Sequence, residues 1–177
     1  NNPTTEGLGY NAHTRKVIDS YEKIVEMAAG GVTATTRCGD AATLTDDFGT
    51  NSIQAAVVDP PYYDTIPYAE FSDVFYVLQK EYLSDIHPGL FSTELTNKDD
   101  EAIANPSKFD AIDGNSSKTE LAKEDYERKM RDIFSELYDL LETGGVLTIM
   151  FTHKKTDAWD TLATSLIEAG FTITATH

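Results

Sequence analysis

Residues 53–64 of the chain read IQAAVVDPPYYD. The apolar run Ile53–Val58 is typical of a buried β-strand. Pro60 and Pro61 end that strand, because proline has no N–H to donate to a central sheet ladder. The stretch therefore places an acid, a rigid turn and two aromatic rings at the carboxyl end of a strand, which is where ligands bind in open α/β sheets.

Outward from this stretch, helical and strand patterns alternate along the chain. Apolar residues at helical spacing, bounded by capping or breaking residues, predict the helices, and short apolar or alternating runs predict the strands. The expected helices run from Thr14 to Gly30, from Pro67 to Tyr82, from Ser117 to Gly144 and from Thr156 or Asp157 to Gly170; the expected strands are 32–37, 53–58, 146–151 and 171–176. The alternation predicts an α/β fold with a mainly parallel sheet and flanking helices.

The length of 177 residues predicts one domain. We interpret the polar residues 1–13 as a flexible terminus, residues 14–177 as the domain and residues 46–52 as a turn. Residues 84–116 form a long connection of weak periodicity, with a short helix expected near 99–104. Connections of that length are usually functional or mobile, so two interpretations stay open: a lid or target-recognition element, or an insertion.

The composition is that of a globular protein, with 40% hydrophobic residues, but it is strongly acidic. There are 14 Lys and Arg against 30 Asp and Glu, which leaves a net charge of −16. Nucleic-acid-binding domains normally carry a basic footprint. Either the surface is adapted to high salt, where dense carboxylates keep a protein hydrated, or the domain does not touch nucleic acid; we favour the first. The single cysteine, Cys38, excludes an internal disulfide framework, and the apolar runs are too short to span a membrane.

The turn after the strand offers the groups that methylation of an exocyclic amine needs. The lone pair of such an amine is delocalised into its ring, and two acceptors for the amino hydrogens favour a pyramidal nitrogen. The Asp59 carboxylate and the Pro60 carbonyl are two such acceptors, and the Tyr62 ring is a face on which an extruded base can stack. The alternative is an ordinary Pro-Pro turn with Tyr62 and Tyr63 as rim aromatics.

The DPPY sequence at 59–62 resembles the target-amine motif of S-adenosylmethionine-dependent amino-methyltransferases, which include adenine-specific DNA methylases. The longer run DPPYYDTIPYAEFSDVFY, residues 59–76, is similar to a group of large archaeal and bacterial DNA methylases. TIMFTHKK at 148–155 and EAGFTITAT at 168–176 resemble the closing part of that group. The resemblance extends over residues 32–177 and implies a partial Rossmann-like fold of the class I methyltransferases.

The resemblance also implies roles for particular residues. The catalytic loop that holds the target amine and its ring would be Asp59, Pro60, Pro61 and Tyr62. The acidic position near the adenine of the cofactor matches Asp40, beside Ala41, and Asp59 also borders the cofactor. For Asp40, a turn aspartate that caps a strand end is an equal alternative.

At the end of the next strand, His153 or Lys154 can contact a substrate phosphate. Tyr62 and Tyr63 complete the expected substrate-binding set, and no metal ligand is implied. For His153 and Lys154 we favour the plainer interpretation, which is that both are solvated residues at the rim of the sheet.

A glycine-rich turn after the first strand, which brings the backbone close to the cofactor in such enzymes, is missing from the sequence. Gly7-Leu8-Gly9 follows no strand, and Gly30-Gly31 is interpreted as a helix cap. We therefore expect a carboxyl-terminal part of the fold, with the N-terminal remainder of a parent protein as its partner and with weak or absent cofactor binding. The strand at 32–37 would then pair in a new position or with a second copy, as a homodimer.

The resulting hypothesis is the catalytic-motif part of a DNA adenine-N6 methyltransferase that uses S-adenosylmethionine on a flipped-out adenine and is inactive by itself. Related loops serve other amines, so cytosine N4, RNA guanine and a glutamine amide are alternatives. An alternative of another class is a noncatalytic scaffold or interaction domain of the same fold. We expect a cytoplasmic protein of a halophilic organism, with no membrane partner.

Overall fold

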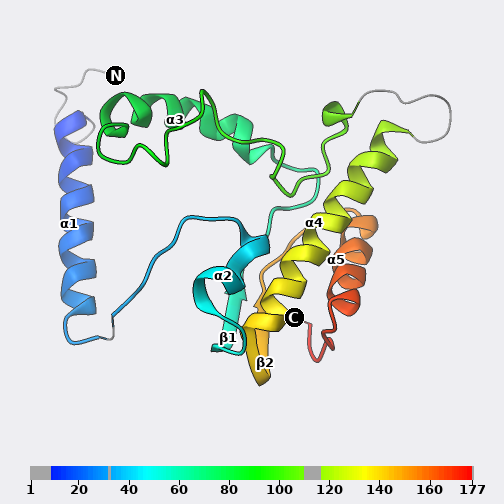
Figure 1. The fold of residues 1–177 in the computed structure, drawn as a ribbon. Helices are drawn as coiled ribbons and strands as arrows, with labels where there is room; N and C mark the ends of the chain where they lie inside the picture. The colour runs from blue at the N-terminus through cyan, green and yellow to red at the C-terminus, as the bar shows by residue number, and fades with distance from the viewer. Residues whose placement is uncertain (1–8, 32, 110–116, 177) are drawn as a thin grey trace. The chain divides into compact units, whose positions relative to one another are not determined.

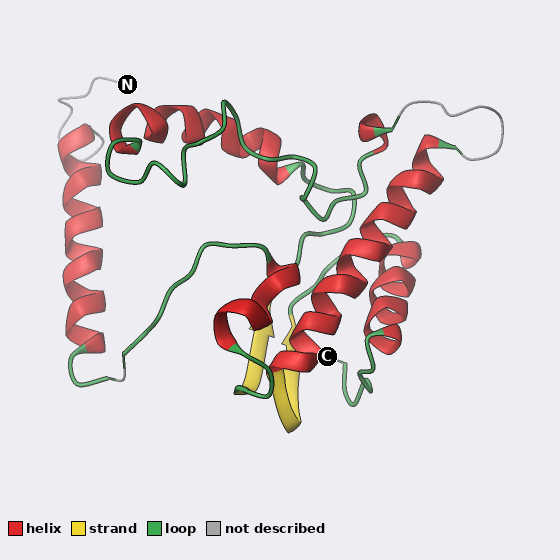
Figure 2. Cartoon of the chain, viewed as in Figure 1, coloured by secondary structure: helices red, strands yellow, loops and turns green. Residues whose placement is uncertain are grey.

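The computed structural model describes residues 9–31, 33–109 and 117–176, and Figures 1 and 2 show the elements that these residues form. The chain divides into two compact units between Cys38 and Gly39. The positions of the two units relative to one another are not determined. Each unit is therefore described by itself, and the expectation of one domain over residues 14–177 stays a prediction.

The described helix of the first unit is α1 (Tyr10–Ala28). It confirms the helix predicted from Thr14 but begins four residues earlier, because its first turn closes on the carbonyl of Gly9, 3.0 Å from the Ala12 nitrogen. The last four residues of the segment 1–13 are thus helical, and its flexibility stays a prediction. The first eight lie outside the described residues.

No strand forms over residues 33–37, so the strand predicted at 32–37 is wrong for the part that the structure describes. These residues are exposed, and no described strand pairs with them. A threonine-rich run has high strand propensity, but extended backbone without a partner strand gains no ladder hydrogen bonds.

The second unit contains a two-stranded parallel sheet of β1 (Ile53–Val58) and β2 (Leu141–Ile149). This confirms the predicted strand at 53–58 and the parallel order. The sequence predicted that the preceding helix ends at Gly144. The helix ends earlier, at Leu140, and Gly144 lies in β2. The pairing register shifts at the start of the sheet, and Gly144 takes a left-handed φ of 84° there. A side chain on Gly145 would put its Cβ 2.9 Å from the Glu142 carbonyl oxygen and 3.1 Å from that of Gln54, so this irregularity in the ladder requires glycine.

Two helices cover one face of the sheet. The helices α4 (Lys118–Leu140) and α5 (Thr156–Glu168) pack side by side (Figure 1). Their inward residues form the core together with Ala56 of β1 and with partly buried side chains of both strands. The helical core residues are Ala122, Tyr126, Met130, Phe134, Leu137, Leu140, Ala158, Leu162 and Leu166.

The ends of these helices follow local chemistry. The predicted capping box of α4 is confirmed, since Ser117 Oγ accepts from the Glu120 N–H at 3.2 Å and the Ser117 N–H bonds to the Glu120 carboxylate at 2.7 Å. The predicted cap of α5 at Thr156 or Asp157 is wrong, because the helix already includes Thr156 and no side chain caps it. Its predicted end at Gly170 is confirmed by a φ of 99°.

The strand predicted at 171–176 does not form. Phe171 is instead used to terminate α5, where its N–H bonds back to the Leu166 carbonyl at 3.0 Å, as in a Schellman motif. The Phe171 ring packs edge-on against Tyr138 of α4, with 5.3 Å between centroids. Residues 172–176 are exposed, and no described strand pairs with them.

A short helical segment precedes β1. It consists of the 3₁₀ turn η1 (Ala41–Thr43) and of α2 (Leu44–Phe48), both packed on α4. The Glu136 carboxylate accepts hydrogen bonds from the backbone and the hydroxyl of Thr45, at 2.9 and 2.8 Å. The turn predicted at 46–52 is therefore wrong over its first three residues, which complete α2.

Pro67 stands immediately before α3 (Tyr68–Leu83), rather than within it as predicted, and α3 buries none of its residues fully. The chain then returns along this helix. Asp73 pairs with Lys98 at 2.7 Å and accepts the Thr96 N–H at 3.0 Å. These contacts, led by the hydrogen bond from Lys98, lower the pKa of Asp73 to about 2.

The helix predicted near 99–104 is wrong; a 3₁₀ turn, η2 (Pro106–Lys108), forms farther along. The backbone of 99–104 makes a local hydrogen bond, from the Ile103 N–H to the Glu101 carbonyl at 3.0 Å, and is also engaged by distant partners. Lys129 donates to the Glu101 carbonyl at 3.2 Å, and the Ala104 N–H bonds to Tyr63. Part of the connection 84–116 is thereby ordered against the core, and residues 110–116 lie outside the described residues.

The second face of the sheet has no covering layer among the described residues of its unit. Val57, Val146 and Met150 point from this face and are 68%, 59% and 53% exposed. The unit is thus a mixed α/β arrangement with a small parallel sheet and helices on one side. Among the described helices, none is both long and apolar enough to cross a membrane.

Candidate functional site

Local hydrogen bonds shape the loop after β1, residues 59–64. The Tyr62 hydroxyl donates a hydrogen bond to Oδ1 of Asp59 at 2.7 Å. This bond is the main cause of a raised pKa of Tyr62, with desolvation and the charge of Asp59 adding to it. The Thr65 N–H bonds to the Tyr62 carbonyl at 3.1 Å. Asp59 is exposed and Tyr62 half-buried, so both lie at the surface just beyond the strand.

Tyr63 anchors the loop in the core. It is 7% exposed, and its φ of 51° is left-handed, which is unfavourable for a residue with a Cβ. The ring packs edge-on against Tyr126, at 5.1 Å between centroids, and against His153, at 5.8 Å. The Tyr63 carbonyl accepts the Ala104 N–H at 3.0 Å. These contacts stabilise a backbone conformation that would otherwise be strained.

Tyr126 of α4 holds the loop from the core side. Its hydroxyl donates to the Pro61 carbonyl at 3.0 Å. Desolvation of its buried side chain is the largest cause that raises the pKa of Tyr126, to about 12. The phenol therefore stays a neutral donor at neutral pH. One carbonyl of the Pro-Pro pair is in this way fixed by a helix that is distant in sequence.

Asp64 joins the end of the loop to the segment after β2. One of its oxygens pairs with Lys155 Nζ, and the other lies 3.2 Å from His153 Nε2. The Lys155 backbone N–H donates to His153 Nδ1 at 3.1 Å. Because Nδ1 is the acceptor, the proton of the neutral imidazole is assigned to Nε2, facing Asp64.

The charges of this cluster follow from those contacts. Desolvation raises the pKa of Asp64, but the hydrogen bonds and charges of Lys155 and His153 outweigh it, so the net shift lowers the pKa. The hydrogen bond with Asp64 is the main cause of a raised pKa of Lys155. Asp64 is therefore a carboxylate, and Lys155 an ammonium, throughout the neutral range.

Aromatic rings line the rim beside Tyr62. Phe151, directly after β2, meets the Tyr62 ring edge-on at 5.7 Å and the Trp159 ring edge-on at 5.1 Å. The Trp159 indole N–H donates to the His153 carbonyl at 3.0 Å. Tyr62 is thus positioned by a ring contact as well as by its hydrogen bond to Asp59.

Two acceptors of the loop have no hydrogen-bond partner in the part of the chain that the structure describes. They are the Pro60 carbonyl and Oδ2 of Asp59. These are the acceptors that the sequence predicted for the two hydrogens of an amine. The neighbouring Tyr62 ring offers a face for stacking, so the loop combines two acceptors with an aromatic surface.

Asp40 and Ala41 are not part of this arrangement. Asp40 accepts the Ala42 N–H at 2.9 Å, which is the turn-capping role that the sequence left open. It lines a hollow of about 330 Å³ beside α4, together with charged residues such as Asp125 and Arg128. No residue of the loop 59–64 lines that hollow.

His153 and Lys154 have different surroundings in the structure. The interpretation of His153 as a solvated rim residue is wrong, because its side chain is only 6% exposed and is held by Asp64 and Lys155. Lys154 is exposed, with no ion pair or hydrogen bond among the described residues. A contact of either side chain with a phosphate stays a prediction.

The described residues do not fit a complete S-adenosylmethionine site. The carboxylate expected near its adenine caps its own turn, and the strand expected before that carboxylate does not form over its described residues, 33–37. The sequence also lacks the glycine-rich turn. For metals, no group of three or more His, Cys, Asp or Glu in the described ranges is arranged to hold an ion.

Sequence reasoning missed three residues that position the loop. No pattern in the sequence pointed to Lys155 or Trp159. Asp64, the partner of Lys155, lies 91 residues away in the sequence. Trp159 bonds to the His153 carbonyl, in a turn whose backbone path could not be predicted. Tyr126 lies in the helix predicted from Ser117, but nothing in that pattern connected its hydroxyl with Pro61. A buried tyrosine needs a partner for its hydroxyl, and that rule was the available clue.

Comparisons of the chain with protein-family models, with curated proteins and with solved structures give no match.

Proposed function

We propose that the second unit is the target-amine part of an S-adenosylmethionine-dependent DNA methyltransferase that acts on N6 of adenine. The observation that carries the proposal is the pair of unengaged acceptors, Asp59 Oδ2 and the Pro60 carbonyl, beside the Tyr62 ring at the carboxyl end of a parallel strand. We refer to residues 59–64 as the target-amine loop.

In this proposal the chain's own residues act by position and electrostatics. The two acceptors take the amino hydrogens of a flipped-out adenine, so that the nitrogen lone pair turns away from the ring. The Tyr62 ring stacks on the base. Pro61, Tyr63 and Asp64 hold these groups in place through the core contacts described above, which limits reorganisation when the base binds.

The proposed fold is a part of the class I methyltransferase arrangement. The parallel sheet with its loop at the carboxyl end supports it, and so does the open second face, because parallel sheets are normally covered on both faces. The methyl donor is then held by residues that this unit does not supply, in a longer polypeptide or in a partner. By itself the unit is expected to transfer no methyl group.

One observation favours a noncatalytic interaction domain as the second candidate. The Tyr62 hydroxyl occupies Oδ1 of Asp59, which is compatible with a purely structural turn. If that is the role of Asp59, removing its carboxylate changes stability and nothing else. Cytosine N4, RNA guanine and a glutamine amide are alternative amines for the same loop.

The test is methyl transfer by the complete polypeptide in which this chain occurs. Labelled methyl groups from S-adenosylmethionine should appear on adenine N6 of DNA, and Asp59→Ala should reduce that transfer at least a hundredfold, on the order of what one positioned acid contributes. Glu81→Ala, an exposed acid on α3, is the matched control and should leave the rate unchanged. Retained transfer in the Asp59 variant, or none in the parent protein, would contradict the proposal.

A further inference from the structure

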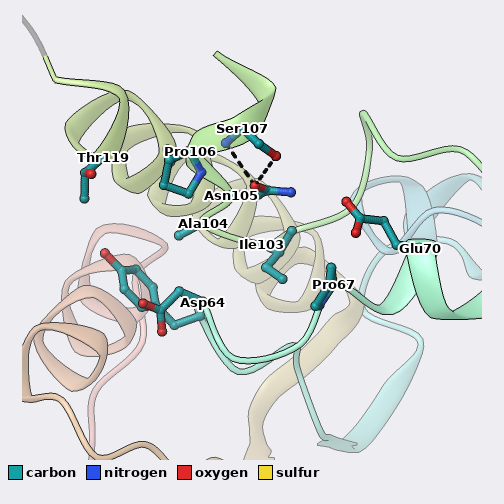
Figure 3. Close-up of a pocket in the computed structure, with 11 residues that line it drawn as sticks. Asp64, Pro67, Glu70, Ile103, Ala104, Asn105, Pro106, Ser107 and Thr119 are labelled. Atoms are coloured by element: carbon teal, nitrogen blue, oxygen red, sulfur yellow. Dashed lines mark hydrogen bonds between the residues drawn. The ribbon is translucent and has the colours of Figure 1, made fainter. Parts of the chain in front are cut away.

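A cavity of about 350 Å³ lies behind the target-amine loop (Figure 3). It is bounded by Tyr63 and Asp64, by the segment 103–107 and by Thr119 and Ala122 in the first turns of α4. Its volume lies in the range of cavities that enclose small organic ligands. Asp59, Pro60 and Tyr62 do not line it, so it is separate from the groups proposed to hold the target amine.

The floor of the cavity is apolar and rigid. Ile103, Ala104 and Ala122 are only 3%, 6% and 1% exposed, and Pro67 stands on the wall. The backbone there is tied to the loop by the bond from the Ala104 N–H to the Tyr63 carbonyl, at 3.0 Å. A flat ring fits such a surface better than a flexible polar chain does, because it loses little conformational entropy on binding.

A donor and an acceptor face this floor. Asn105 Oδ1 accepts from the N–H and the hydroxyl of Ser107, at 3.0 and 2.6 Å, so its Nδ2 is the group left to donate. The Glu70 carboxylate, near the start of α3, has no hydrogen bond or ion pair among the described residues. Figure 3 shows the Asn105 amide nitrogen and the Glu70 carboxylate directed toward each other from neighbouring walls.

The charge of the cavity excludes a phosphate ligand. Asp64 and Glu70 line it, whereas no Lys or Arg does. Asp64 is already engaged by Lys155 and His153, which leaves Glu70 as the acceptor for a ligand. The chemistry that remains is a neutral, flat heterocycle that presents an N–H donor beside an acceptor.

We propose that this cavity binds a nucleobase by an edge on which an amino N–H lies next to a ring nitrogen, as on adenine or cytosine. Glu70 accepts from the amino group, and Asn105 Nδ2 donates to the ring nitrogen. The pairing of these two groups with one edge parallels the way in which proteins distinguish bases by donor and acceptor patterns. If the proposed function holds, the occupant is a base beside the flipped-out target.

Two nucleosides separate this cavity from the target-amine loop. Adenosine carries the amino group and, on either side of it, the ring nitrogens N1 and N7, whereas 1,7-dideazaadenosine keeps the amino group and has a C–H in place of both ring nitrogens. The loop needs only the amino hydrogens and should bind both equally. The cavity should bind adenosine about tenfold more tightly, since one hydrogen bond is lost and Asn105 Nδ2 is left unpaired.

The measurement is nuclear magnetic resonance titration of the isotope-labelled full chain. It follows the backbone signals of 103–107, which report on the cavity, separately from those of Asp59 and Tyr62, which do not line it. Glu70→Gln should weaken adenosine binding at 103–107 about tenfold, while Glu81→Gln, the same change outside the cavity on α3, should not. Asp59→Ala should remove the response at Tyr62 and leave the response at 103–107 unchanged. Equal binding of the two nucleosides at 103–107, no response there, or equal effects of the two glutamine variants would each overturn the cavity proposal and leave the proposed function standing.

Discussion

The two faces of the parallel sheet differ in what covers them. On one face, Ala56 is buried and Val58 partly buried beneath α4 and α5, and Met130 and Phe134 of α4 are fully inaccessible to solvent. On the other face, Val57 is 68% exposed. Both faces carry apolar side chains, as expected for a parallel sheet that is normally sandwiched between helices. The strands therefore have the apolar pattern of a sheet that is covered by helices on both faces, whereas the described part of this unit covers only one face.

The target-amine loop belongs to the covered face. Tyr63 and the Tyr126 hydroxyl tie it to the same core that the helices form, and Asp64 ties it to the segment after β2. These contacts all come from the covered side of the sheet, so the loop can be ordered without helices on the open face.

The largest expected effect separates the two faces directly. Phe134→Ala should lower the free energy of unfolding by about 3–5 kcal/mol, because it removes a fully buried ring and leaves a cavity. Val57→Thr keeps a β-branched side chain on the open face and should change the free energy of unfolding by less than about 0.5 kcal/mol. Urea unfolding measures both. Similar losses for the two variants would mean that the second face is covered in solution.

A smaller effect is expected where the core meets the loop. Tyr126→Phe removes the hydroxyl that bonds to the Pro61 carbonyl and should cost about 1 kcal/mol of unfolding free energy. It should also shift the backbone resonances of residues 59–64 while leaving those of α5 in place. Tyr138→Phe, on the same helix but 49% exposed, serves as the control. Unchanged loop resonances would show that the loop does not depend on the core.

The smallest effect concerns the ion pair of Asp64. Asp64→Asn should destabilise the fold at pH 7 by less than about 1 kcal/mol, because both partners are partly exposed to solvent. The folded-state pKa of Asp64 is lowered. Its contribution to the free energy of unfolding is therefore present above the unfolded-state pKa of about 3.9 and is lost as pH falls through the folded-state pKa.

The alkaline side gives the complementary test of the same pair. The folded-state pKa of Lys155 is raised, so its contribution is full below about 10.4 and disappears as pH rises through the folded value. Unfolding measured across both limits should show the variant converging with the parent protein at each end. Asp85→Asn, an exposed acid outside the cluster, should give no such dependence. A difference that persists at both extremes would contradict the assigned ion pair.

Much of the fold could be predicted from local chemistry. The capping box at Ser117, the apolar strand before Pro60 and the glycine that ends α5 each act within a few residues, and all three occur where the sequence placed them. The position of the acceptors at the end of β1 follows from the same local pattern.

Features that depend on distant partners could not be predicted. Residues 33–37 have the composition of a strand, but no described strand pairs with them. The expected helix end at Gly144 lies instead in β2, where Gly145 closely approaches the Gln54 carbonyl of β1. The contacts of Asp64 with Lys155 join residues that lie far apart in the sequence. Local propensity contains no information about such pairs.

The most direct test of the central claim is the response of the target-amine loop to an amine and to its blocked form. Adenosine and N6,N6-dimethyladenosine share one ring system, but the second has no amino hydrogens for Asp59 and the Pro60 carbonyl to accept. In resonance titrations of the chain, adenosine should shift the signals of Asp59 and Tyr62, the loop residues outside the cavity, and dimethyladenosine should bind there at least about tenfold more weakly. Equal binding of the two, or no response of these residues to either, would contradict the account.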